Sequence, residues 1–169
     1  MRTVLRSLEP GLTKGLEVLI ATTLALLVVD VLWGVFTRYV LGAQANWTEE
    51  LARFLLVWVA LLGGAVAFGR KAHLGVDYFV HRLHPAARKQ TAVVAHLVVL
   101  FFAGAILLLG GTRAVSEALA LGQTTPALGW KMGYVYLALP ISGFFVVFYT
   151  LQNLGETLGG PTADRTAEE

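Results

Sequence analysis

The polar and charged side chains that could do the most chemistry lie where the first apolar segment ends and the second begins. Glu49 and Arg53 are four residues apart, in the order that favours an ion pair on a helix. Arg38 ends the preceding segment, so we expect Arg38 and Arg53 to share Glu49 and Glu50 in a charge network at a membrane edge. Charges this close to lipid are costly unless they are paired. The group therefore either anchors and caps the helices or forms a docking surface for another subunit, and both interpretations stay open.

The same residues predict where the second helix begins. Asn46, with Glu49 three residues later, resembles a capping box, and Glu49 and Glu50 would lie in the first turn, where the helix dipole favours anions. Trp47 and Trp130 are expected at the outer ends of spans, where aromatic side chains meet the membrane interface.

Asp30 lies inside the first apolar segment, and an intramembrane carboxylate is a candidate functional group. It could couple transport to protons or sodium, pair with a residue of a partner helix, or be protonated and hydrogen-bonded to a threonine. A cation site needs several oxygen ligands, and a single acid supplies few. This requirement disfavours ion coupling without excluding it.

Several kinds of chemistry find no support in the residues. There is no cysteine, which excludes disulfides and thiolate metal sites. His96 is the only histidine within a predicted span, whereas a bis-histidine haem needs two, so a redox anchor is disfavoured. His73, His81 and His84 are interpreted as part of a solvated basic segment and not as a metal site. We expect no enzyme activity, cofactor, metal or nucleic-acid partner, since catalytic and nucleotide motifs are missing and the aqueous segments are short.

The elements that carry these residues are long and apolar. Of 169 residues, 56% are hydrophobic and 14% charged, against about a quarter charged in soluble domains. Four windows are each long enough to cross a hydrocarbon layer of about 30 Å. The sequence predicts an all-α integral membrane protein with one domain over 1–155 and a polar C-terminal tail over 156–169. The expected spans are about 16–38, 48–69, 91–113 and 131–152.

The connecting segments and small residues add detail. Residues 74–83, which include Asp77, predict a short amphipathic helix in the membrane interface between helices two and three. Gly63 and Gly64 belong to a small-xxx-small pattern that lets helices pack closely. Pro126 favours an extended Thr125, and Pro140 is expected to kink the fourth span.

Charge also predicts the orientation. Lysine and arginine number nine on the face that carries both termini and four on the other, so we expect cytoplasmic N- and C-termini. The first apolar stretch exceeds the ~7–15 residues of a signal-peptide core, which favours a retained anchor.

Several motifs together are similar to a known family. In chain order they are Arg38-Tyr39-Val40 with Trp47-Thr48-Glu49-Glu50 and Arg53; Trp58 with Gly63-Gly64-Ala65; His73-Leu74-Gly75-Val76-Asp77; and Thr125-Pro126-Ala127-Leu128 ahead of Tyr136 and Pro140. Over about residues 12–155 the chain resembles the small membrane subunit of tripartite ATP-independent periplasmic (TRAP) transporters.

The resemblance implies a multi-pass scaffold subunit in the bacterial inner membrane, without a substrate site of its own. It would support a large permease subunit that carries the substrate and sodium sites, while an extracytoplasmic binding protein delivers the substrate, often an organic acid. The residues expected at the subunit interface or in structural roles are Arg38, Trp47, Glu49, Glu50, Arg53, Gly63, Gly64, Asp77, Thr125, Pro126 and Pro140. The alternative is a stand-alone small multidrug exporter, working as a dimer, that couples to protons through Asp30.

Overall fold

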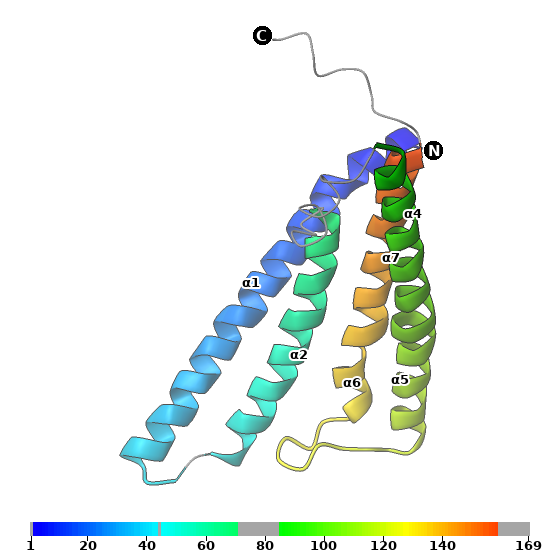
Figure 1. Cartoon of the computed structure of the whole chain (residues 1–169). Coiled ribbons are helices and arrows are strands. Elements are labelled where there is room, and N and C mark those ends of the chain that lie inside the picture. Colours follow the sequence, from blue (N-terminus) through cyan, green and yellow to red (C-terminus); the bar gives the residue numbers. More distant parts are fainter. Residues whose placement is uncertain (1, 44, 71–84, 159–169) are drawn as a thin grey trace, which may run out of the picture.

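Four long helices dominate the computed structural model, which describes residues 2–43, 45–70 and 85–158 (Figure 1). Each is long and apolar enough to cross a membrane, so the prediction of an all-α membrane protein with four spans is confirmed. The four spans are Gly11–Val40, Asn46–Gly69, Lys89–Ala120 and Met132–Leu158. The amphipathic helix predicted over 74–83, with Asp77, falls outside the described residues, as does most of the predicted tail.

Two of the four spans are interrupted helices. The first two spans are the single helices α1 (Arg2–Val40) and α2 (Asn46–Gly69). The third consists of α4 (Pro85–Phe102), a π-helical segment η1 (Ala103–Gly110) and α5 (Gly111–Ala120). The fourth consists of α6 (Met132–Tyr136) and α7 (Ala138–Leu158). With 39 residues, α1 extends for about 58 Å at 1.5 Å per residue, well beyond its apolar window.

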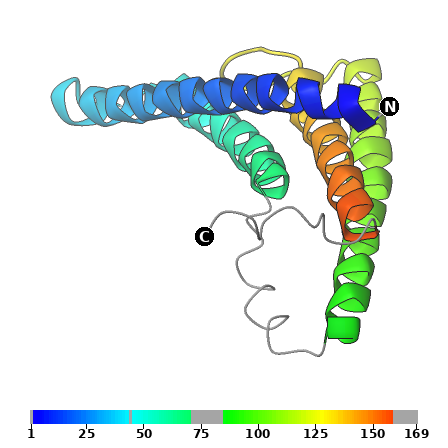
Figure 2. The ribbon, with the colours of Figure 1, turned by 90° about the horizontal axis from the view of Figure 1, so that it is seen from above.

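The helices splay and do not form a parallel bundle. The end of α1, the start of α2 and segment 121–131 lie at one end of the molecule, here called the loop end (Figure 1). Helices α2 and α7 finish at the other end, here called the terminal end. Helix α1 packs against α2, and α2 packs against α7. On its other side, α7 packs against η1 and α4. Seen from above, α1 runs out to one side and away from the third span (Figure 2). The centre of the fold is therefore α2 with α7.

Two buried clusters hold the spans together. Leu16, Leu62, Val66 and Tyr149 join α1, α2 and α7. Ala65, Ala103, Leu107 and Val146 join α2 and α7 to the third span. Outside these clusters most large apolar side chains of α1 and the third span are exposed, as expected of surfaces that face lipid or another membrane protein.

The third and fourth spans approach closely at glycines. A Cβ atom built on Gly111 would lie 2.8 Å from the Cβ of Leu139 and 3.0 Å from the Cδ of Pro140. The fourth span is divided at Leu137, three residues before Pro140. Since proline has no N–H, the carbonyl of Tyr136 loses its usual helical hydrogen bond. The division at Leu137 therefore has a local cause in the sequence.

Candidate functional site

Two buried threonines fix the turn between α1 and α2. The hydroxyl of Thr37 donates to the carbonyl of Gly34 (3.0 Å) and accepts from the N–H of Ala45 (3.5 Å). The hydroxyl of Thr48 donates to the carbonyl of Ala45 (2.8 Å). Asn46 begins the helix, but its expected capping role is wrong: Ala45 is the N-cap residue, and no side chain caps this end. Thr48 stabilises the helix start from within the first turn instead.

The expected charge network is only partly present. Arg53 donates to Glu49 at 3.5 Å, and both side chains are about 70% exposed (69% and 72%). Arg38 is exposed and forms no ion pair with any residue that the structure describes. Its expected share in the network is therefore wrong, because Glu49 pairs with Arg53 and Glu50 accepts backbone N–H groups from another segment. A long, exposed pair of this kind contributes little stability.

Glu50 has a different partner from the one expected. One carboxylate oxygen accepts two backbone hydrogen bonds, from the N–H of Ala127 (2.9 Å) and the N–H of Leu128 (2.8 Å). Charged acceptors form shorter and stronger bonds than neutral ones. Glu50 thereby joins the start of α2 to segment 121–131, about 77 residues further along the chain.

Thr125 organises the segment that Glu50 holds. Its side chain is buried (2% exposed), and its hydroxyl accepts from the N–H of Trp130 (3.0 Å) while its own N–H donates to the Trp130 carbonyl (2.8 Å). Gly129 has a φ of 67°, a conformation that favours glycine. The Thr-Pro-Ala-Leu motif is thus a compact turn, in which Pro126 is exposed.

Asp30 is buried in the loop-end half of α1. Its side chain is 5% exposed, and neither carboxylate oxygen has a hydrogen-bond partner among the described residues. It lines a pocket of about 290 Å³ between α1 and α2, together with Gly34, Arg38, Thr48 and Glu49. Three of the residues singled out in the sequence, Asp30, Arg38 and Glu49, therefore share one pocket.

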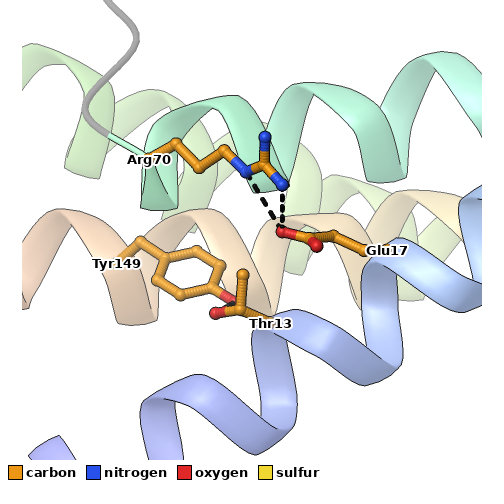
Figure 3. Close-up of polar contacts among 4 residues, drawn as sticks. All are labelled: Thr13, Glu17, Arg70 and Tyr149. Atoms are coloured by element: carbon orange, nitrogen blue, oxygen red, sulfur yellow. Dashed lines mark hydrogen bonds and ion pairs between the residues drawn. The ribbon is translucent and has the colours of Figure 1, made fainter.

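A second polar group at the terminal end was missed in the sequence. The guanidinium of Arg70 donates to one oxygen of Glu17 at 2.6 and 3.0 Å (Figure 3). Beside it, the hydroxyls of Thr13 and Tyr149 share a hydrogen bond of 2.9 Å. The group joins α1, α2 and α7 where these helices meet.

A signal for this group was present in the sequence. Tyr149 and Asn153, four residues apart, place polar side chains on one face of α7. The amide of Asn153 donates to the carbonyl of Phe68 (3.2 Å). This face of α7 therefore packs against the end of α2.

Several small residues of α2, on the face away from the rest of the chain, are open. A Cβ atom on Gly63 or Gly64 would meet nothing within 4 Å, and Ala60, Gly64 and Ala67 are exposed. Trp47 and Trp130 are 40% and 52% exposed. Among the described residues, no three histidine or acidic side chains are grouped to hold a metal ion.

A family model and two individual relatives all match this chain to the same kind of transporter component. The family described as "Tripartite ATP-independent periplasmic transporters, DctQ component" matches residues 26–160. The chain is 31% identical to the sialic acid TRAP transporter small permease protein SiaQ of Vibrio cholerae, over 82% of this chain and 78% of that protein. It is 29% identical to a putative TRAP transporter small permease protein of Haemophilus influenzae, over 92% and 94%.

A longer relative is also similar. The chain is 30% identical to the isethionate TRAP transporter permease protein DctMQ of Oleidesulfovibrio alaskensis. The match covers 67% of this chain but only 18% of that protein. In that relative, a region like this chain is one part of a much larger permease polypeptide.

Proposed function

The chain belongs to the DctQ family of TRAP transporter components, and we propose that it is the scaffold that supports a large permease subunit in the bilayer. The observation that carries the proposal is the DctMQ relative, in which the matching region forms 18% of one permease protein. Such a fusion joins the two parts in one polypeptide, which keeps them at a high effective concentration in the same membrane and favours contact between them. We propose that this chain and the large subunit are neighbours in the same way, but on two separate polypeptides.

The surface of the chain supports this role. Its fold leaves the small residues around Gly63 and Gly64 uncovered, and small residues are enriched where membrane helices approach closely. The large apolar side chains on α1 and the third span are also exposed. We propose that part of this surface faces the large subunit and part faces lipid.

The finer function is our proposal, and the family resemblance supports it. We propose that the complete transporter takes up an organic acid together with sodium, and that an extracytoplasmic binding protein delivers the substrate. The relatives named for sialic acid and isethionate support the substrate class, since both compounds are organic acids. The chain would reside in the bacterial inner membrane with both termini cytoplasmic, as its lysines and arginines favour. The loop end would then be extracytoplasmic.

Arg53 gives a direct test of the docking surface. We expect Arg53→Glu to weaken co-purification of the large subunit by about tenfold, as loss of a charge contact of ~1.4 kcal/mol would. The internal Glu49–Arg53 pair is exposed, so the variant should fold normally. Lys131→Glu makes the same charge change at an exposed site in segment 121–131, outside the exposed faces of α1, α2 and the third span, and should have no effect. Unchanged co-purification with Arg53→Glu would remove this residue from the interface.

The stand-alone exporter remains the competing function. Its only specific support is the buried carboxylate of Asp30, and family membership favours the scaffold.

A further inference from the structure

Asp30 is a buried carboxyl group inside a membrane span. It lies ten residues before the end of α1 at Val40, a depth of about 15 Å along the helix. Both carboxylate oxygens are buried and lack a partner among the described residues. An isolated buried charge is costly, so buried ionisable groups in membranes pair with another group or become neutral.

The charged neighbours of Asp30 do not satisfy it. Glu49, across the pocket, is itself acidic and is paired with Arg53. Arg38 lies two turns further along α1, about 12 Å away along the axis, and its side chain is exposed. The hydroxyl of Thr48 is engaged with the carbonyl of Ala45. At the deep end of the pocket, the two oxygens of Asp30 can therefore accept hydrogen bonds that no described residue donates.

The walls of the pocket indicate what covers it. Val31 and Val35 line it and are 47% and 48% exposed, while Gly34 contributes no side chain. This apolar part of the rim, which lies beside the polar Arg38 and Glu49, suits either lipid tails or a helix. Lipid tails carry no hydrogen-bond donor, and a head group would have to descend about 15 Å to reach the carboxylate. A membrane helix can deliver a donor at that depth.

We propose that Asp30 pairs with an arginine or lysine from a membrane helix of the large permease subunit, which seats in this pocket when the transporter assembles. The inference rests on the proposed scaffold function and names one of its contacts. An arginine fork can bind both carboxylate oxygens at once, and a lysine can supply up to three donors. The pair would form only in the complex, which explains why both oxygens lack a partner among the described residues of the isolated chain.

The test compares the isolated chain with the complex. The large subunit of the same transporter is co-expressed with tagged wild-type chain, with Asp30→Asn, and with Glu117→Gln. Glu117 is an exposed acid on α5, so its variant controls for the loss of one negative charge. We expect Asp30→Asn to retain at least about tenfold less large subunit, while the isolated variant unfolds at the wild-type temperature or above it. Glu117→Gln should match wild type in both measurements.

A second set of variants identifies the partner. In the Asp30→Asn background, each arginine or lysine in the membrane helices of the large subunit is changed to glutamine. One of these changes should restore retention, because it removes the charge that has lost its partner.

Three results would overturn the pairing. They are normal retention with Asp30→Asn, a loss of thermal stability in the isolated Asp30→Asn chain that matches its loss of retention, and no rescue of Asp30→Asn by any glutamine variant of the large subunit. If wild-type chain retains no large subunit, the proposed scaffold function itself fails.

Discussion

Two adjacent glutamates show how surroundings decide the role of a residue. Glu49 points to Arg53 on its own helix and stays exposed. Glu50 accepts two N–H groups from the distant segment 121–131. The sequence indicated correctly that helix positions 49 and 53 pair, since their spacing alone brings them together. The contact of Glu50 could not be predicted, because it depends on how two hairpins pack.

The contact made by Glu50 gives a prediction at the residue scale. Glu50→Ala removes a charged acceptor from two backbone N–H groups, a loss of about 1–3 kcal/mol. We expect the amides of Ala127 and Leu128 to exchange with solvent at least about tenfold faster, because local opening becomes easier. Hydrogen exchange read by mass spectrometry measures this.

The neighbouring residue supplies the control. Glu49→Ala should leave exchange in segment 121–131 unchanged, and Glu50→Gln should recover part of the protection, since its amide oxygen can still accept. Equal exchange in the two alanine variants would contradict the role given to Glu50.

At the scale of helices, the sequence identified the spans but not their close contacts. Hydropathy and length are local properties, so the four spanning helices followed from them. The small residues noticed in α2 are open within the chain, whereas Gly111 and Gly143, on the third and fourth spans, are covered. The local sequence is similar around the open and the covered glycines. Only the way in which whole helices pack distinguishes the two sets. The π-helical segment η1 was likewise not foreseen.

The glycine contacts predict different effects of two alanine substitutions on the stability of the chain. Gly111→Ala would bring a Cβ atom to 2.8 Å from Leu139, and we expect it to destabilise the chain by about 1–3 kcal/mol through overpacking. Gly104→Ala, in the same span, would meet nothing within 4 Å and should be neutral or slightly stabilising. Thermal unfolding in detergent compares them. Equal melting temperatures would show that the Gly111 contact is not tight.

At the scale of the whole molecule, the packing of the helices against one another is incomplete. Its helices splay (Figure 2), and two small clusters form its core. A buried carboxylate lacks a partner among the described residues. These features suit a subunit that finishes its packing against another membrane protein. The sequence predicted this role mainly through its motifs, because exposed apolar surface on a membrane helix has the same composition whether lipid or protein covers it.

The scaffold role is tested most directly by expressing the large permease subunit with and without this chain. Both preparations are then compared by size-exclusion chromatography and thermal unfolding in detergent. We expect the two chains to elute as one complex, and the large subunit alone to unfold at a lower temperature or aggregate. Separate elution, with a large subunit equally stable on its own, would contradict the scaffold function.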